Sequence, residues 1–375
     1  MMSSITPRYR VCHQRCDRQR PVVVILSLIV WLVSCGGGGA GGSDQQEGLF
    51  SGRLLFGHAM FDDAWYLDLS TGHYGPVPHL VWGDDENTLC DGLTNFSVSS
   101  AQGGERLLES RIGCQPADGD VYGWFSQFAL RDGDGRFLDA FVLLLEPGEF
   151  LYGPARLSPD GQRVAMTGTF SGDAGSFHVQ LFSIDGEWLG TSTEQRVRDV
   201  SVDWLPDNRL IYASGQSVYI APPDSAAGEA WLTFDEAEGE PSHLAVSPDG
   251  KQLAFTLVSD TSLVSTFGDI WVADLESGAL RRLAYAPDVA RLNHPIWSPD
   301  GKWIGFLWDV PTNATSTLAS ADYFIVPSDG EDIVVSQDGL SDGVRVQSWL
   351  SDLRPGAPPE YTYRFPRTAP IACLP

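Results

Sequence analysis

Ser247-Pro-Asp-Gly250 lies at the centre of the stretch that decides the fold, Ala245-Val-Ser-Pro-Asp-Gly-Lys-Gln-Leu-Ala-Phe255. The same register recurs in Ile296-Trp-Ser-Pro-Asp-Gly-Lys-Trp-Ile-Gly-Phe306 and in Arg156-Leu-Ser-Pro-Asp-Gly-Gln-Arg-Val-Ala-Met166. In each copy a large apolar residue lies three places after the glycine, and another lies two places later. This spacing predicts a strand with one buried face. Repetition at this period determines architecture before it says anything about chemistry.

Each Ser-Pro-Asp-Gly phrase predicts a tight turn between two antiparallel strands. Proline presets φ at the first central position, aspartate suits the second, and glycine takes the position that needs positive φ. Trp204-Leu-Pro-Asp-Asn208 is a degenerate copy, because asparagine also tolerates positive φ. The turn residues of the three close copies are Ser158, Asp160, Gly161, Ser247, Asp249, Gly250, Ser298, Asp300 and Gly301.

The spacing of these hairpins predicts a closed ring of similar units. First strands start near residues 95, 154, 200, 242 and 293, and a composite unit combines about 346–352 with about 52–78. We therefore expect an all-β fold, a six-bladed β-propeller of four-stranded antiparallel blades, in which the first and last blade share strands.

The hairpin phrase followed by Asp269-Ile-Trp-Val-Ala-Asp274 and a turn resembles the TolB-type propeller repeat. Three copies match closely and three loosely, so the resemblance covers about residues 52–352. It implies a propeller fold and a place in the bacterial cell envelope. TolB itself is soluble in the periplasm, whereas this chain is expected to carry a lipid.

The N-terminus predicts export and lipid anchoring. A basic start precedes the apolar run Val22 to Val33, whose 12 residues are too few to span a bilayer as a helix. Leu32-Val33-Ser34-Cys35 resembles a bacterial lipobox, so Cys35 is expected to carry diacylglycerol and palmitate. By resemblance to lipoproteins, Gly36 after the modified cysteine favours the outer membrane, with the domain facing the periplasm or the cell surface. The expected parts are a signal peptide (1–34), a Gly-rich tether (35–50), the propeller (51–353) and a Pro-rich C-terminal tail (354–375).

Composition limits the partners. The formal charge of -25 and the sequence pI of about 4.4 disfavour nucleic acid, because an acidic surface repels phosphate backbones. Outside the cytoplasm a disulfide is permitted, and Cys90 and Cys114 bracket one polar segment that a bridge would close. Alternatively Cys373 pairs with one of these two, since spacing does not decide between them.

Candidate chemistry is sparse. The sequence holds no metalloprotease, paired Cys-x-x-Cys or phosphate-loop motif, so no metal and no cofactor are expected. His243 and His294 occupy equivalent places just ahead of successive first strands and are expected at one rim of the central channel, unless they are simply loop residues of the repeat. Gly339-Leu-Ser-Asp-Gly343 matches a nucleophile elbow, but the residues after it favour a strand, so we interpret it as a loop between blades.

These features favour a lipid-anchored binding or scaffold module of the envelope, with a protein or glycan partner and the membrane itself as the other contact. The alternative is a propeller hydrolase or lyase that acts with channel carboxylates and histidines. A catalytic role is the less favoured of the two, because no catalytic residue is identified from the sequence.

Overall fold

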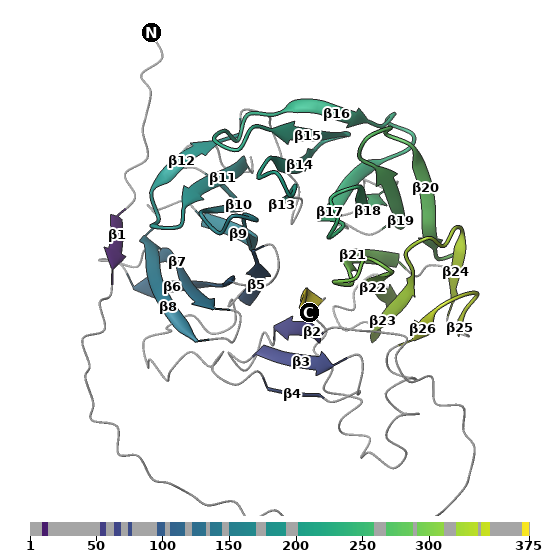
Figure 1. Cartoon of the computed structure of the whole chain (residues 1–375), viewed down its shortest axis with the longest axis horizontal. Coiled ribbons are helices and arrows are strands. Elements are labelled where there is room, and N and C mark those ends of the chain that lie inside the picture. The colour runs from purple at the N-terminus through teal and green to yellow at the C-terminus, as the bar shows by residue number, and fades with distance from the viewer. Residues whose placement is uncertain are drawn as a thin grey trace, which may run out of the picture.

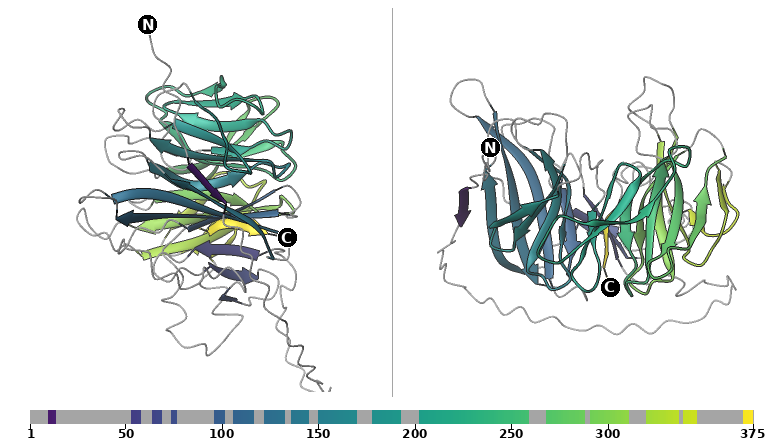
Figure 2. Two further views of the ribbon diagram at one scale, coloured as in Figure 1. Left: turned by 90° about the vertical axis from the view of Figure 1, so that its left-hand side faces the viewer. Right: turned by 90° about the horizontal axis from the view of Figure 1, so that it is seen from above.

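A computed structural model of the 375-residue chain describes residues 10–13, 53–57, 64–68, 74–76, 96–101, 106–116, 122–132, 136–144, 150–169, 178–192, 202–258, 268–287, 291–310, 320–336, 339–345 and 370–374. Every regular element among these residues is a β-strand. Figure 1 shows the strands grouped into sheets around a ring, and the side views of Figure 2 show a disc. The all-β class and the propeller arrangement predicted from the repeat are confirmed.

Most strands of each sheet come from one stretch of the chain, but β1, β24, β25 and β27 join sheets formed mainly by other stretches. Their hydrogen-bonded orders are β1-β8-β7-β6-β5, β12-β11-β10-β9, β13-β14-β15-β16, β17-β18-β19-β20-β24-β25, β21-β22-β23-β26 and β27-β2-β3-β4. The strands of the first half are β1 (Arg10–His13), β2 (Arg53–Gly57), β3 (Ala64–Asp68), β4 (Tyr74–Pro76), β5 (Phe96–Ser100), β6 (Arg106–Pro116), β7 (Tyr122–Asp132), β8 (Phe137–Leu144), β9 (Phe150–Leu157), β10 (Arg163–Thr169), β11 (His178–Ser183) and β12 (Trp188–Thr191). Those of the second half are β13 (Val202–Trp204), β14 (Leu210–Ser214), β15 (Ser217–Ala221), β16 (Glu229–Thr233), β17 (Glu240–Val246), β18 (Gln252–Val258), β19 (Asp269–Asp274), β20 (Leu280–Tyr285), β21 (Arg291–Trp297), β22 (Trp303–Val310), β23 (Ser320–Pro327), β24 (Ile333–Ser336), β25 (Gly339–Leu340), β26 (Val344–Arg345) and β27 (Pro370–Leu374).

The inner strands close the ring. Each inner strand contacts the next in the order β5, β9, β13, β17, β21 and β27, and β27 contacts β5. The count of six blades stays a prediction.

The two chain ends share one sheet, as the composite blade predicts, but the strand that supplies its inner edge differs from the expected one. β27 pairs antiparallel with β2, from Arg53 opposite Leu374 to Phe56 opposite Pro370. The sequence assigned this role to about 346–352, which lies outside the described residues, and treated 354–375 as a tail. Alignment on the Pro-Asp turn missed β27 because Pro370–Leu374 contains no such turn.

The turn phrases form the hairpins that they predict. Gly161, Gly250 and Gly301 have φ of 66°, 69° and 70°, and Asn208 in the degenerate copy has φ of 67°. Within the first turn, the Ser158 hydroxyl donates to Asp160 Oδ1 at 2.6 Å and accepts the N–H of Arg163 at 2.9 Å. The same pair of hydrogen bonds recurs at the turns of Ser247 and Ser298. The serine is thus a structural member of the turn.

The strand after each turn is buried on both faces, where the sequence predicted one. Leu253 and Phe255 of β18 pack against the preceding sheet, while Ala254 between them packs against the following sheet. All three side chains are fully buried. A blade in a ring has a neighbour on either side, so its middle strands carry large residues on one face and small ones on the other.

Side chains also join successive inner strands by hydrogen bonds. Trp204 Nε1 donates to the carbonyl of Arg156 at 3.0 Å, and Trp297 Nε1 donates to the carbonyl of Ala245 at 2.9 Å. In each pair the tryptophan directly precedes the turn of one sheet, and the acceptor lies two residues before the turn of the sheet before it. The intervening joints use the side chain of the residue two before the turn as acceptor. Ser99 Oγ accepts the N–H of Leu157 at 2.9 Å, and Asp203 Oδ2 accepts the N–H of Val246 at 2.8 Å.

The segment from β24 to β26 connects the sheet of β17–β20 with the sheet of β21–β23. β24 pairs in parallel with β20 of the preceding sheet, and the chain then returns through β25 to pair β26 with β23. Arg282 of β20 donates to Asp332 Oδ1 at 2.7 Å, just ahead of β24. The Gly339–Gly343 stretch begins with β25 and leads directly into β26, so the helix that a nucleophile elbow needs does not follow it.

Replacing Trp297 by Phe should lower the free energy of unfolding by about 1–3 kcal/mol, because the joint to Ala245 loses its buried donor. Trp308→Phe is the matched control. Trp308 is equally buried, but its Nε1 has no hydrogen-bond partner among the described residues, so the same truncation removes no bond. Urea unfolding of both variants measures the difference, and equal losses would contradict the role of the joint.

Candidate functional site

Two inner strands carry a bulge at the same place, and each bulge presents a histidine. In β17 the pairing with β18 shifts between Ser242 and Ala245, and in β21 the pairing with β22 shifts between Asn293 and Ile296. His243 and His294 stand in these bulges with φ of 50° and 51°. Positive φ is uncommon outside glycine and is maintained only where the surroundings impose it. A bulge also re-aims a side chain out of its regular alternation.

The bulges bring the two imidazoles into contact. The ring centroids of His243 and His294 are 3.9 Å apart, with 40° between the ring planes. His243 is only 3% exposed, and the Nδ1 atoms of both rings are buried without a hydrogen-bond partner among the described residues. The sequence placed both residues just ahead of their strands. They lie inside the strands instead, because the bulge interrupts the alternation from which the strand start was inferred.

Two charged residues on inner strands earlier in the ring act electrostatically on the histidines or on each other. Arg156 in β9 and Asp203 in β13 hold the same position, two residues before the turn. Burial raises the pKa of Asp203, while the guanidinium of Arg156 and the N–H groups of Val246 and Trp204 oppose that rise. The positive charge of Arg156 also lowers the pKa of both histidines, although β9 and β21 are not adjacent in the ring.

The imidazoles are held neutral. Burial lowers the pKa of His243 well below its usual range, with the nearby His294 and Arg156 adding to the effect. Burial and the Arg156 guanidinium lower the pKa of His294 to about 4. At neutral pH each ring therefore offers one N–H donor and one unprotonated nitrogen. A histidine with so low a pKa is a weak general base near neutrality.

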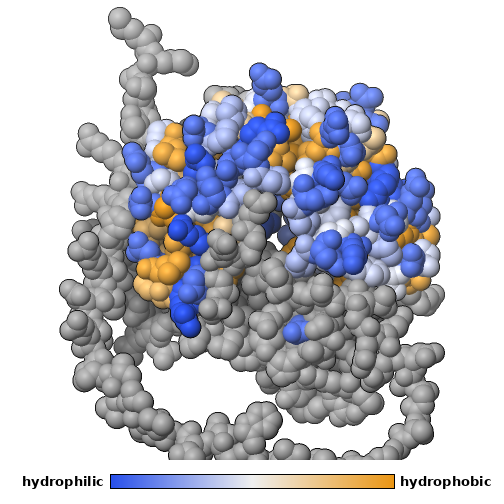
Figure 3. Space-filling model, viewed as in Figure 1, coloured by the Kyte–Doolittle hydropathy of each residue, from blue (hydrophilic) through white to orange (hydrophobic). Residues whose placement is uncertain are grey.

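Sequence reasoning missed Arg156 and Asp203, although a signal was present. The position two residues before the turn is Ala245 in one aligned copy and Ile296 in another, so the charged pair departs from the apolar pattern. From the sequence alone this departure does not indicate a site, because a single strand gives no sign of what its inner face looks onto. Figure 3 shows a hollow near the centre of the ring, viewed down the same axis as Figure 1.

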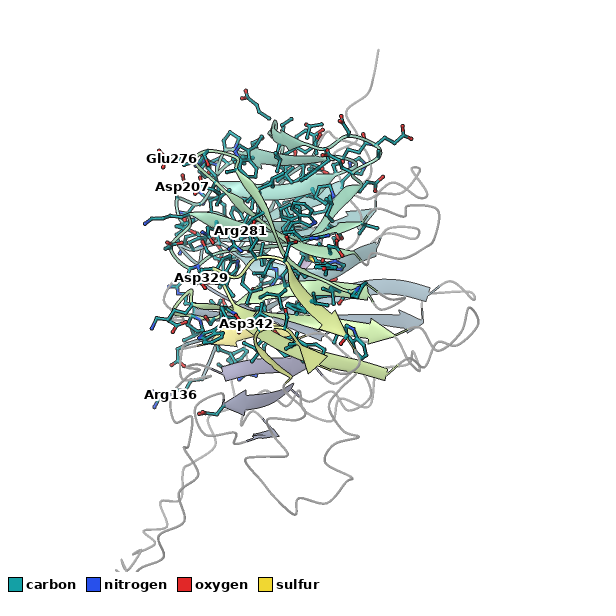
Figure 4. The ribbon with its side chains drawn as sticks, turned by 90° about the vertical axis from the view of Figure 1, so that its right-hand side faces the viewer. Arg136, Asp207, Glu276, Arg281, Asp329 and Asp342 are labelled. Atoms are coloured by element: carbon teal, nitrogen blue, oxygen red, sulfur yellow. The ribbon has the colours of Figure 1, made fainter. Side chains whose placement is uncertain are left out.

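The other candidate residues do not join this site. The turn residues serve the hairpins, on a face of the disc where Asp207, Glu276, Asp329 and Asp342 point outward (Figure 4). Cys35 and Cys90 lie outside the described residues. Cys114 and Cys373 are placed only by their backbones, in β6 and β27, so the disulfide stays a prediction. Within the described ranges no group of three or more His, Cys, Asp or Glu side chains is arranged to hold a metal ion.

A second perturbed acid lies away from the channel. Glu109 of β6 is fully buried and accepts a hydrogen bond from Arg131 Nε of β7 at 2.8 Å, while its Oε2 has no partner among the described residues. Burial outweighs the attraction of Arg131 and raises the pKa of Glu109 to about 7. The pair lies between strands of one sheet, so we interpret it as structural.

None of the described elements is a helix long and apolar enough to cross a bilayer.

Comparison with known proteins finds only distant similarity to solved structures. No protein family and no curated protein matches the chain. Among solved structures, the periplasmic gluconolactonase of Pseudomonas aeruginosa is 19% identical, with 73% of this chain and 79% of that chain covered and a TM-score of 0.43. A puromycin hydrolase is 14% identical over 74% of this chain and 42% of its own, with a TM-score of 0.45. A chain of the mitotic checkpoint complex is 14% identical over 85% and 89%, with a TM-score of 0.40.

Stability should fall as the pH drops from about 6.5 to 4 because of His294. The folded protein keeps this ring neutral to about pH 4, whereas the unfolded chain takes up the proton near 6.5, so acid favours unfolding by up to about 3 kcal/mol. Asn tolerates positive φ, so His294→Asn should fold and lose this part of the acid sensitivity. Denaturant unfolding between pH 4 and 8 tests the difference. NMR titration of the wild-type ring near pH 6.5 would contradict it.

Glu109 should act in the opposite direction over the same pH range. Its carboxyl ionises near pH 4.5 in the unfolded chain and near 7 in the folded one, so rising pH costs up to about 3 kcal/mol of stability across this interval. Glu109→Gln keeps an acceptor for Arg131 but cannot ionise. Its stability should therefore lack this decline between pH 4.5 and 7. An unchanged pH profile in the variant would show that Glu109 is ionised throughout.

Proposed function

We propose that the protein is a lipid-anchored binding module of the bacterial envelope that presents its channel site to the periplasm or the cell surface. The observation that carries the proposal is the buried contact between the neutral rings of His243 and His294, whose pKa values the charge of Arg156 also lowers. The two rings offer hydrogen-bond donors and acceptors, which are groups for recognition. The carboxyl of Asp203 is already engaged with the N–H of Val246.

The envelope address rests on the sequence. The basic start, the apolar run that ends at Cys35 and the glycines after it support cleavage before Cys35 and attachment of lipid to its sulfur, with the outer membrane favoured. Cleavage there would also remove Arg10–His13, which pairs with β8 in the full chain. In the mature protein β8 would then be an outer edge, as outer strands of propeller blades are.

The TolB-type resemblance and the ring of inner strands support a propeller of six blades that is closed by β27 and β2. Residues 51–353 together with β27 would form this domain. The expected partner is a protein or a glycan. Nucleic acid is disfavoured by the charge of -25.

The rival function is a hydrolase or lyase that uses channel histidines and carboxylates. The clustering of His243 and His294 is the observation that favours it. Hydrolysis of this kind generally needs a carboxylate free to exchange a proton with substrate. Asp203 meets one requirement, a raised pKa, but its Oδ2 accepts a backbone hydrogen bond.

Lipidation and binding can be tested together in the native envelope. We expect the mature protein to incorporate a palmitate analogue and to remain with membranes, and Cys35→Ala to lose both properties, because the sulfur is the attachment point. Cys373→Ala is the matched control and should retain them. Labelling that persists in Cys35→Ala would contradict the anchor.

Crosslinking followed by affinity capture of the lipidated protein should recover a specific envelope partner. Arg156→Gln should recover less of it, whereas Arg209→Gln, which alters an exposed arginine of a hairpin turn, should not. Turnover of a glycan or peptide panel with no captured partner would establish the hydrolase or lyase function instead.

A further inference from the structure

The outer edge of β8 holds an added strand in the full chain. β1 pairs antiparallel with it, from Arg10 opposite Leu144 to His13 opposite Phe141 (Figure 1). β1 belongs to the signal peptide that cleavage before Cys35 would remove, so this inference rests on that part of the proposed function. The mature protein would keep the edge and lose the strand that covers it.

Outer strands elsewhere in the ring are either covered or short. β20 has six residues and receives β24, and β23 has eight and receives β26. The outer strands β4, β12 and β16 have three, four and five residues. Added strands and short edges both prevent uncontrolled pairing. Among the described sheets, β8 is therefore the long outer strand, of eight residues, whose cover would be cleaved away.

The half of β8 that lies beyond β1 is protected in other ways. Its pairing with β7 skips Leu138, which forms a bulge. Asp139 Oδ1 accepts the N–H of Ala140 at 2.8 Å and places a charge on the edge. Bulges and charged side chains both discourage the addition of a strand. Phe137 and Leu138 are exposed, but they lie in this protected half.

The half that β1 covers, Phe141–Leu144, is regular. Its residues pair one to one with β7, from Phe128 opposite Phe141 to Phe125 opposite Leu144. Phe141 and Leu143 belong to the apolar cluster shared with β9 and β10, and Val142 between them is only half-buried. An added strand therefore finds a straight backbone and apolar neighbours here, and only this half of β8 is suited to pairing.

We propose that the Phe141–Leu144 edge of β8 is a docking site for an extended segment of a partner protein. The segment adds as an antiparallel strand in the place that β1 occupies before cleavage. Main-chain hydrogen bonds give such an interaction its affinity, and alternate side chains give it specificity. In the register of β1, Val11 stands opposite Leu143 and is preceded by Arg10. The fitting segment accordingly carries an apolar residue next to a basic one.

The charge of the chain favours a basic partner over a second copy. At a formal charge of -25, two copies of the protein repel each other, whereas a basic segment is attracted. The strand that occupies the edge in the full chain has this character, since it contains Arg10 and His13.

A synthetic peptide with the sequence Pro7 to Gln14 is the probe for the test. It is added to the mature lipidated protein, and amide hydrogen exchange is followed by mass spectrometry. We expect the peptide to slow exchange in β8 by about tenfold, because the open edge gains hydrogen bonds. The full chain that retains its signal peptide should respond less, since β1 already occupies the edge.

Two lysine variants separate the two halves of the strand. Val142→Lys should weaken peptide binding by about tenfold, because it places a charge on the half that pairs. Leu138→Lys makes the same change of charge in the bulged half and should bind as the wild type. A peptide with Val11→Asp loses the apolar residue opposite Leu143 and should not slow exchange. This last change leaves the protein, and therefore its fold, unaltered.

Equal binding by the two lysine variants, or slowed exchange in other strands in place of β8, would overturn the inference. Slow exchange of β8 without peptide, together with a dimer that Val142→Lys dissociates in analytical ultracentrifugation, would assign the edge to a second copy. Palmitate labelling and the mass of the mature chain are measured separately. A chain that keeps its signal peptide contradicts the envelope proposal, whereas a cleaved and lipidated chain that does not respond to the peptide contradicts only the docking site.

Discussion

The ring depends on hydrogen bonds that join each inner strand to the next at a fixed position before the hairpin turn. At two joints a tryptophan donates to a backbone carbonyl, and at the joints between them a serine or aspartate side chain accepts a backbone N–H. All four use the residues one or two places before the hairpin turn, so the turn determines where along the strand each joint lies. Apolar clusters between neighbouring sheets fill the space around these joints.

The same joints position the candidate site. The carbonyl of Arg156 accepts a hydrogen bond from Trp204, while the charge of its side chain lowers the pKa of His294. The carboxylate of Asp203 accepts a hydrogen bond from the N–H of Val246, three residues after His243. The scaffold and the site therefore use the same positions of the repeat. This sharing explains how a repeated structural unit can carry a site that is not repeated: the backbone role is kept in every copy, and the side chain is free to differ.

Buried ionisable groups give this acidic protein two opposing responses to pH. The neutral imidazole of His294 favours the folded state as pH rises from 4, and the carboxyl of Glu109 favours it as pH falls from 7. Because both groups change over nearly the same interval, their effects on stability largely offset one another near pH 5.5. The surface carries the large negative charge, while the interior combines a few acids and bases whose pKa values are shifted mainly by burial.

The sequence by itself determined the hairpins, because serine, proline, aspartate and glycine or asparagine at fixed offsets set a local turn that needs no distant contact. It also determined the circular all-β architecture, since strands that repeat at a constant period must bury their faces against copies of themselves. Only the tertiary structure decided that Pro370–Leu374 joins Arg53–Gly57, that β24 crosses to the preceding sheet, and that His243, His294, Arg156 and Asp203 meet. These contacts join residues tens to hundreds of positions apart, and a β-bulge changes where a side chain points without leaving a mark in the apolar periodicity.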